Sequence, residues 1–375
     1  MRLIISGGGT GGHIYPAVTI AREVAKLTDS CEILFVGTKH GLEADIVPKE
    51  GFNFATIEVR GLERRISWQN VQTLLKTVGS VWSSAKIIKK FKPDVVIGTG
   101  GYVCGPVLLA ASLLKIPTMI QEQNVIPGIT NKILSRFVDK IAVGYKEAEQ
   151  YFKKYKPDQI IFTGNPIRPE VMSAARVEGQ TALGLEPNKL TLLVVGGSRG
   201  ARSINNAMFD VYKHFNGSQR IQILHVTGQS EYNSIVGNIK QAGIDISSGG
   251  NIIIKPYLYN MPLALAASDL AIFRAGAVGL AELTARGIPA ILIPYPYAAE
   301  NHQEFNARAL ERHGAATVIA DKELTGVKLT NTIENLLENP TMLSGMAEKS
   351  RELGRPQAAE AIARLALCLI KLQSK

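Results

Sequence analysis

Glycine-rich loops carry the clearest chemical signal in this 375-residue sequence. Residues 7–13 read GGGTGGH directly after a short apolar run, and Pro16 follows where we expect a helix to open. Glycines let the backbone approach a ligand closely, and a helix N-terminus offers unpaired amide donors and a positive dipole end. The first loop therefore predicts a binding site for an anionic group such as a phosphate.

Three more segments repeat this construction. Residues 98–106 read GTGGYVCGP, residues 196–202 read GGSRGAR, and residues 274–282 read RAGAVGLAE before a closing Gly287. Each loop alone could be a tight turn, but glycine loops after successive strands favour ligand sites at the carboxyl edges of sheets. Glu282 lies about one and a half turns into its helix. Its carboxylate could accept hydrogen bonds from two ribose hydroxyls, and the alternative is a solvated helix glutamate.

His13 closes the first glycine loop and has two possible roles. At a helix N-terminus the positive dipole end favours a neutral imidazole, which is the form that a general base requires. A lone histidine is more often structural, and here it could simply orient the loop.

The first loop also matches the dinucleotide pattern GxGxxG through Gly7, Gly9 and Gly12. A nicotinamide site further needs an acidic residue at the end of the second strand, to hold the ribose. The second expected strand ends in residues 35–38, which read FVGT and contain no acid. A dehydrogenase is therefore only a minor alternative.

The elements that must position these loops alternate along the whole chain. Apolar, β-branched runs predict strands over 3–5, 33–36, 94–97, 118–121, 140–143, 191–195, 222–225, 252–254, 270–273 and 290–293. Helix-patterned stretches separate them, which predicts right-handed βαβ crossovers and parallel sheets. We expect an α/β protein with two doubly wound domains that join near residues 164–166, and a last amphipathic helix over 356–371.

Composition narrows the functional classes. The three cysteines are far apart and form no CxxC pair, which argues against a disulfide framework or a zinc site and is typical of a reducing cytoplasm. No apolar run is long enough to span a bilayer, and the N-terminus lacks the apolar core of a signal peptide. The net charge of +10 favours an anionic partner. Aromatic residues do not cluster with the basic runs, so a nucleic-acid binder is not expected.

A basic, partly apolar stripe suggests a membrane surface. The helix-spaced apolar residues are Val71, Leu74, Leu75, Val78, Val81, Trp82 and Ala85, and they lie between Arg64-Arg65 and Lys86, Lys89, Lys90 and Lys92. Such a stripe can lie in an anionic membrane interface or pack on the sheet, and we expect it to do part of each. No DxD motif occurs, so we expect no metal at the site.

Taken together, these motifs resemble glycosyltransferase family 28, in particular its MurG family. These membrane-associated enzymes add N-acetylglucosamine to lipid I in peptidoglycan synthesis. The similarity rests on the four loops together with QEQN at 121–124, GNPIR at 164–168 and NHQEFNA at 301–307, in order along nearly the whole chain. It implies a GT-B fold of two Rossmann-like domains facing a cleft. Residues 1–164 would form the acceptor domain, with a helix at about 352–375 packing back on it, and 165–351 the donor domain.

The resemblance also implies residue roles. Glu282 would bind the ribose, Arg168 and Leu258 the uracil, and Ser198 and Ala277 the diphosphate. Further contacts to UDP-N-acetylglucosamine would come from Thr10, Gly11, Gly12, Asn124, Val278, His302 and Gln303. The acceptor diphosphate would lie at Gly9, Gly100, Gly101 and Tyr102. His13 would be the general base, and Glu122 the second candidate.

Three departures from the family pattern bear on these roles. Gln121 stands where histidine is common and cannot act as a base, Cys104 replaces a serine, and Ala275 replaces another. The first departure narrows the choice of base to His13 and then Glu122.

The resemblance implies an inverting transferase without cofactors, peripheral on the cytoplasmic face of the inner membrane. Its partners would be UDP-N-acetylglucosamine, lipid I, the anionic membrane surface and other cell-wall synthesis proteins, but no nucleic acid. A UDP-N-acetylglucosamine epimerase on a similar fold is the alternative enzyme, and it would need neither an acceptor nor a lipid surface.

Overall fold

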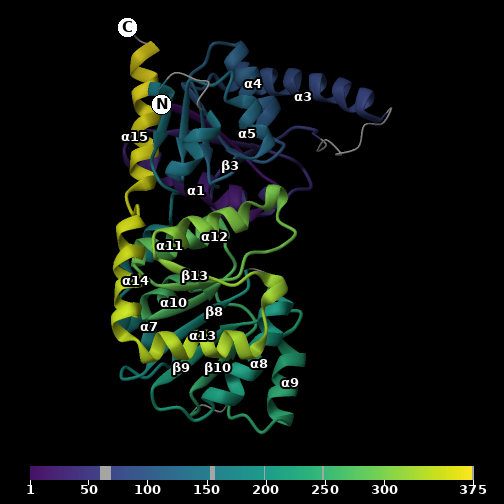
Figure 1. Cartoon of the computed structure of the whole chain (residues 1–375). Helices are drawn as coiled ribbons and strands as arrows, with labels where there is room; N and C mark the ends of the chain where they lie inside the picture. Colours follow the sequence, from purple (N-terminus) through teal and green to yellow (C-terminus); the bar gives the residue numbers. More distant parts are fainter. Residues whose placement is uncertain (60–68, 153–156, 198, 247–248, 374–375) are drawn as a thin grey trace. The chain divides into compact units, whose positions relative to one another are not determined.

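The computed structural model describes residues 1–59, 69–152, 157–197, 199–246 and 249–373, with the backbone alone for 69–78, 157 and 372–373. The chain forms two compact units, which are coloured by sequence in Figure 1. Unit 1 comprises Met1–Ile167 and Pro356–Lys375, and unit 2 comprises Arg168–Arg355.

The first division falls slightly later than the expected join near 164–166. Asn165 keeps this segment in unit 1, because its side chain donates to the Gln123 carbonyl (2.9 Å) and accepts from the Gln121 amide (2.9 Å). The return to unit 1 also begins later than expected, because α14 (Pro340–Leu353) still packs on α11 (Ala277–Arg286) within unit 2.

Unit 1 contains a seven-stranded parallel sheet in the order β3-β2-β1-β4-β5-β6-β7. Its strands are β1 (Arg2–Gly7), β2 (Glu32–Gly37), β3 (Asn53–Thr56), β4 (Val95–Gly100), β5 (Thr118–Glu122), β6 (Lys140–Val143) and β7 (Ile160–Phe162). The strand order reverses between β1 and β4, and such switch points are where open α/β sheets bind ligands.

Helices cover both faces of this sheet. They are α1 (Gly11–Lys26), α2 (Glu43–Lys49), α3 (Gln69–Phe91), α4 (Cys104–Leu113), α5 (Ile129–Leu134), η1 (Lys146–Phe152), η2 (Pro157–Gln159) and α15 (Ala358–Gln373). Leu3 and Ile5 of β1 pack in one core with α1 and α15, whereas Ile4 points into the other core with α4. α15 packs against α1, and Figure 1 shows α15 in yellow along one edge of unit 1.

Unit 2 repeats the plan with a six-stranded parallel sheet in the order β10-β9-β8-β11-β12-β13. The strands are β8 (Leu190–Val195), β9 (Ile221–Val226), β10 (Ile252–Lys255), β11 (Leu270–Phe273), β12 (Ala290–Leu292) and β13 (Ala316–Val318). The other helices are α6 (Pro169–Ser173), α7 (Arg176–Leu183), α8 (Arg202–Phe215), α9 (Tyr232–Gln241), α10 (Met261–Ala267), η3 (Ala299–Asn301), α12 (His302–Arg312), η4 (Asp321–Glu323) and α13 (Gly326–Glu338). Its switch point lies between β8 and β11.

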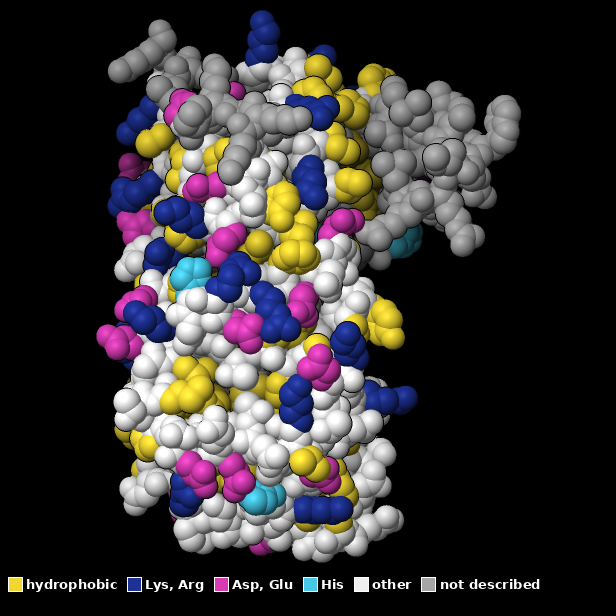
Figure 2. Space-filling view, viewed as in Figure 1, with side chains coloured by type: hydrophobic (Ala, Val, Ile, Leu, Met, Phe, Trp, Pro, Cys, Tyr) yellow, Lys and Arg dark blue, Asp and Glu magenta, His cyan; other side chains and the backbone are white. Residues whose placement is uncertain are grey.

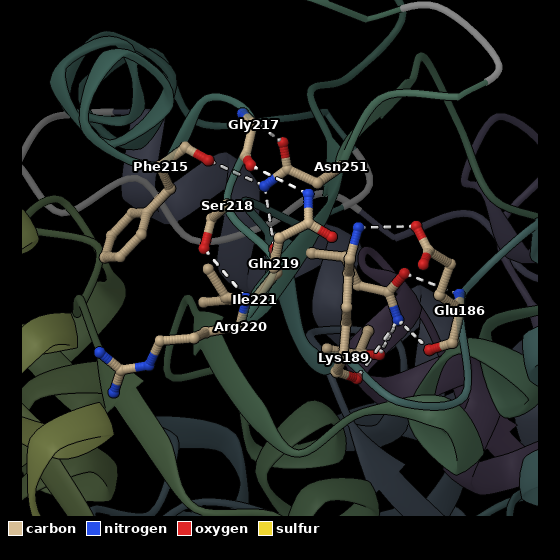
Figure 3. A network of polar contacts seen from close by, with 11 residues as sticks. Glu186, Lys189, Phe215, Gly217, Ser218, Gln219, Arg220, Ile221 and Asn251 are labelled. Carbon is tan, nitrogen blue, oxygen red and sulfur yellow. Dashed lines mark hydrogen bonds and ion pairs between the residues drawn. The ribbon is translucent and has the colours of Figure 1, made fainter.

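Buried side-chain amides connect the amino ends of β8, β9 and β10, as Figure 3 shows. Asn251, just before β10, donates to the carbonyls of Phe215 (2.8 Å) and Ile221 (2.9 Å) and accepts from the Gly217 amide (2.9 Å). Because ligands of such sheets bind at the opposite, carboxyl edge, we assign this network to stability rather than to binding.

Two details of the expected fold are wrong. The sequence did not predict β3, β7 and β13, which are short strands at sheet edges. Nor does Pro16 open a helix, since α1 already begins at Gly11 and Pro16 lies inside it. The helix begins at Gly11, within the glycine loop, because the Thr10 carbonyl accepts from the amides of His13 (3.0 Å) and Ile14 (3.2 Å).

Candidate functional site

The two glycine loops of unit 1 lie against each other beyond the carboxyl ends of β1 and β4. The Gly8 amide donates to the Gly100 carbonyl (3.3 Å). Gly101 has a φ of +83°, and a Cβ on it would collide with the Gly8 backbone, so only glycine suits this position. The predicted loops therefore meet at the switch point and form one surface.

His13 lies in the first turn of α1 with its ring against the second loop. Its Nδ1 is 2.9 Å from the Gly8 carbonyl oxygen and 3.5 Å from the Thr10 hydroxyl. A carbonyl oxygen only accepts, so Nδ1 carries the proton and Nε2 is the basic nitrogen of the neutral ring. A Cβ on Gly100 would come within 3.0 Å of Nε2, so this position of the second loop has no room for a side chain. This tautomer suits a general base whose working atom is Nε2.

Cys104 serves the structure of the second loop. Its thiol is fully buried and donates to the carbonyls of Ser6 (2.7 Å) and Gly100 (2.9 Å). Burial raises the pKa of this thiol to about 12, so it stays protonated. The thiol therefore makes the hydrogen bonds that a serine hydroxyl would make, and the departure at this position is conservative.

Glu122 is buried and engaged with its own loop. One carboxylate oxygen accepts from the Asn124 amide (2.9 Å), and the other accepts from the Gly128 amide (3.1 Å) and the Asn131 side chain (2.8 Å). This places Asn124 at the carboxyl end of β5, and Gln121 points into a buried amide network with Asn165. These hydrogen bonds indicate that Glu122 stabilises its own loop. They also make it a weaker candidate for the general base than His13.

The remaining candidates of unit 1 gather around the first loop. Gly11 and Gly12 form the first turn of α1, where backbone amides have no partners within the helix. Thr10 is exposed as the residue before that turn, and Tyr102 is exposed beside Gly9. The Gly9 amide already donates to the Glu43 carboxylate (3.0 Å), so it is not free to donate to a ligand. Gly9 can still let a ligand approach the backbone closely, because it has no side chain.

In unit 2, Glu282 is buried and paired with Arg168. The guanidinium donates to one carboxylate oxygen through Nε (3.0 Å) and Nη2 (2.9 Å). Burial raises the pKa of Glu282, and the neighbouring Arg168 opposes this rise. Only 5% of Glu282 is exposed, so the interpretation as a solvated helix glutamate is wrong. The structure thus pairs two residues to which the family resemblance gives neighbouring parts of one nucleotide.

The other unit 2 candidates lie at carboxyl ends of strands or at helix starts. Ala277 and Val278 begin α11, directly after β11. Leu258 is half-buried in the segment after β10, between Tyr257 and Tyr259. His302 and Gln303 begin α12, where Gln303 accepts from the Tyr295 amide (2.9 Å). Ser198 lies outside the described residues.

Two charged residues near these loops were missed as functional candidates. Arg274, directly after β11, donates to Asp321 (2.6 Å) and Ser203 (2.8 Å) and so ties the start of α8 to η4. Glu43 lies beneath the first glycine loop. A weak signal existed for Glu43, because an acid soon after the second strand is a feature of nucleotide-binding folds. The sequence placed Arg274 at the start of the loop 274–282 but carried no signal for its partners, which are 47 and 71 residues away.

Within the described ranges, no group of three or more His, Cys, Asp or Glu side chains is arranged to hold a metal ion. None of the helices in those ranges combines the length and the apolar character that crossing a bilayer requires.

Comparison with known proteins decides the family. Residues 3–143 match the glycosyltransferase family 28 N-terminal domain, and residues 191–364 match its C-terminal domain. A relative from Desulforamulus reducens is 53% identical over 96% of both chains. The chain belongs to glycosyltransferase family 28.

The names of similar family 28 members agree with one another. The relative from D. reducens and one from Halothermothrix orenii (50% identical, 97% of this chain and 98% of the relative) are both named UDP-N-acetylglucosamine–N-acetylmuramyl-(pentapeptide) pyrophosphoryl-undecaprenol N-acetylglucosamine transferase. Among solved structures, MurG of Acinetobacter baumannii is similar with a TM-score of 0.78 at 27% identity, covering 98% of this chain and 99% of its own.

These findings confirm the predicted family and the GT-B fold class of two parallel-sheet α/β domains. They also bear on the epimerase alternative. The UDP-GlcNAc 2-epimerase of Neisseria meningitidis has a TM-score of 0.71 over 98% of this chain, but only 13% identity. That similarity shows a shared fold and nothing about activity.

Proposed function

We propose that this protein transfers N-acetylglucosamine from UDP-N-acetylglucosamine to the muramyl 4-hydroxyl of lipid I, which yields lipid II for peptidoglycan synthesis. The observation that carries the proposal is the 53% identity, over 96% of both chains, to a relative named for this transfer. The engaged Glu282–Arg168 pair and the His13 tautomer support it from the geometry.

In this proposal unit 2 binds the donor. Glu282 accepts the two ribose hydroxyls, Arg168 and Leu258 contact the uracil, and His302 and Gln303 contact the sugar. The diphosphate is bound by Ser198 and by Ala277 and Val278, the last two of which begin α11, where helix amides have no partner within the helix. The start of α8 can supply further amides of this kind. These amides and the positive ends of the two helix dipoles stabilise the negative charge of the departing UDP.

Unit 1 binds the acceptor and supplies the base. The muramyl 4-hydroxyl oxygen attacks the anomeric carbon, and the bond from that carbon to the UDP oxygen breaks, so UDP leaves with the electron pair. The hydroxyl proton passes to Nε2 of His13, since Nδ1 already donates to Gly8. Gly9, Gly100, Gly101 and Tyr102 hold the acceptor diphosphate, and we assign further contacts with UDP-N-acetylglucosamine to Thr10, Gly11, Gly12 and Asn124.

We expect purified protein to form lipid II from UDP-N-acetylglucosamine and a short-chain lipid I analogue, at the same rate with and without EDTA. The physical reason is that helix termini, rather than a DxD-bound metal, carry the charge of the leaving group. Product is measured by chromatography with labelled donor. Donor epimerised without acceptor would favour the epimerase instead, and an EDTA loss restored by Mg²⁺ or Mn²⁺ would contradict metal-independent transfer.

We also propose that α3 contributes to a peripheral membrane face. Arg64 and Arg65 lie outside the described residues, and so do the side chains of Val71, Leu74, Leu75 and Val78. In the described part of the helix, Ile88 is buried, and Trp82 is 61% exposed with the Lys86 ammonium 3.3 Å from its ring centroid. Lys89 and Lys90 are exposed on the same helix. The face drawn in Figure 2 shows Lys and Arg interspersed with Asp and Glu, so net charge alone identifies no membrane face there.

Reversing the charge of Lys86, Lys89 and Lys90 should weaken binding to anionic vesicles by about 1 kcal/mol per residue, because each basic residue near such a surface contributes about that much. Vesicle sedimentation measures it, and activity on a soluble acceptor analogue should survive. The same reversal at Lys213, Lys240 and Lys322 of unit 2 is the matched control and should leave binding unchanged. If vesicle binding is unchanged in both triple variants and at high salt, the membrane face lies elsewhere.

A further inference from the structure

Glu43, the first residue of α2, is a buried carboxylate with no assigned role. Its side chain is completely buried, at 0% exposure, beneath the first glycine loop. One oxygen accepts from the Thr38 amide (3.0 Å) and the Thr38 hydroxyl (2.7 Å), and the other accepts from the Gly9 amide (3.0 Å). Both oxygens are thus engaged, and Glu43 cannot contact a substrate in this arrangement.

The surroundings keep this carboxylate charged. Burial alone raises the pKa of Glu43, but the hydrogen bonds from Thr38 and Gly9 outweigh burial and leave the pKa below its usual value. The chain also clears space for it, because a Cβ on Gly8 or Gly37 would come within 2.6 Å of the Glu43 side chain. A Cβ on Gly41 would come closer still. A negative charge is therefore fixed directly under the loop.

One peptide group connects Glu43 to His13. The Gly9 amide that donates to Glu43 and the Gly8 carbonyl that accepts from His13 Nδ1 belong to the same peptide unit. In a planar trans peptide the N–H and the C=O point in opposite directions. The Glu43 carboxylate therefore accepts a hydrogen bond from the N–H of this peptide, and the His13 imidazole donates a hydrogen bond to its C=O on the opposite side.

We propose that Glu43 is a positioning residue that acts on His13 through the Gly8–Gly9 peptide. It fixes the peptide so that the Gly8 carbonyl lies 2.9 Å from Nδ1, nearer than the Thr10 hydroxyl at 3.5 Å, and this favours the tautomer with Nε2 as the basic nitrogen. The buried charge also polarises the peptide, and hydrogen bonds in such a chain strengthen one another. The arrangement performs the task of the carboxylate in a Ser-His-Asp triad, with a peptide inserted between carboxylate and imidazole.

The effect on His13 as a base rests on the proposed function, whereas the effect on the tautomer does not. The test is a two-bond ¹H–¹⁵N correlation spectrum of histidine-labelled full-length protein, with the His13 signals assigned by their loss in His13→Gln. The wild type should show His13 with its proton on Nδ1. Glu43→Gln should shift part of the population to the Nε2-protonated form, because the peptide is no longer held by a charge.

Steady-state kinetics complete the test. Glu43→Gln should lower kcat by about tenfold, a barrier rise of about 1.4 kcal/mol, with the donor KM within about twofold of the wild type. Asp45→Asn is the matched control, since Asp45 lies on the same helix, is exposed and pairs with Lys49. It should leave both the spectrum and kcat unchanged. If Glu43→Gln does not fold by circular dichroism, Glu43→Asp replaces it, because the shorter side chain cannot reach Thr38 and Gly9 together.

The outcomes separate the two proposals. A lowered kcat with the wild-type tautomer would overturn the inference and leave Glu43 as a support of the fold. An unchanged tautomer with unchanged kcat would overturn it as well. A shifted tautomer with unchanged kcat would support the positioning role and contradict His13 as the base, so the proposed mechanism would fail alone.

Discussion

Replacing His13 with alanine should lower kcat by about 10²–10⁴-fold, the range that loss of a general base typically costs. The acceptor hydroxyl must lose its proton as it attacks, and no other imidazole or amine lies in the first glycine loop. Donor affinity should change little, because Glu282 and Arg168, which we propose to bind the donor, belong to unit 2. Steady-state kinetics with the lipid I analogue give kcat, and calorimetry with UDP-N-acetylglucosamine gives the affinity.

Two variants separate a base from a structural residue. His13→Asn keeps a donor that can reach the Gly8 carbonyl but has no basic nitrogen, so it should lose about as much rate as His13→Ala. If His13→Asn keeps most of kcat, the ring only orients the loop. The search would then move to Glu122, and Glu122→Gln would have to reproduce the rate loss. We expect instead that Glu122→Gln mainly destabilises the loop that contains Gly128 and Asn131, because one Glu122 oxygen accepts hydrogen bonds from both residues.

The sequence predicted the central strands of both sheets because their signal is strong and local. Strands such as β1 and β4 are buried on both faces, which gives uninterrupted apolar runs, and each is followed by glycines. The edge strands β3, β7 and β13 have three or four residues each and are only partly buried, and they were not predicted. The equally short β12 is fully buried and was predicted, so the missing signal is the weak apolar pattern of a short, partly exposed run, which fits a turn or a helix end equally well.

For the candidate site, the sequence predicted positions but not partners. The glycine loops and His13 could be placed after their strands because the chain order fixes which edge of a parallel sheet each loop joins. The ion pair of Arg168 with Glu282 joins residues 114 positions apart, so no local pattern carries it. The same holds for Glu43 and Gly9, which are 34 positions apart and meet only once β1 and β2 pair.

Glu282→Ala should weaken binding of UDP-N-acetylglucosamine by about 2–3 kcal/mol, the range for hydrogen bonds to a charged group, or about 30- to 150-fold in Kd. A carboxylate can accept from both ribose hydroxyls, whereas alanine offers no acceptor. Isothermal titration calorimetry measures this affinity directly. Unchanged affinity would remove Glu282 from the donor site.

Removal of Glu282 also leaves the Arg168 guanidinium without its buried partner, so a folding effect must be separated from a binding effect. Glu282→Gln keeps the shape and one acceptor oxygen but no charge, and it should bind with an intermediate affinity. Thermal unfolding of each variant without donor shows whether unit 2 is still folded. A loss of affinity that follows the loss of thermal stability across the variants would assign Glu282 to the fold rather than to the ribose.

The pH dependence supplies an independent check on the same residue. Because burial raises the pKa of Glu282, its carboxylate becomes protonated at a higher pH than an ordinary glutamate, and a protonated carboxyl no longer accepts through both oxygens. Donor affinity should therefore fall as the pH is lowered through this raised pKa.

Arg168→Gln removes the positive charge that opposes the rise in the pKa of Glu282, so the fall in donor affinity should begin at a higher pH than in the wild type. The midpoint of the fall, rather than the affinity itself, is the quantity to compare, since Arg168 also contacts the uracil in our proposal. A midpoint that does not move would mean that the ion pair leaves the ionisation of Glu282 unchanged.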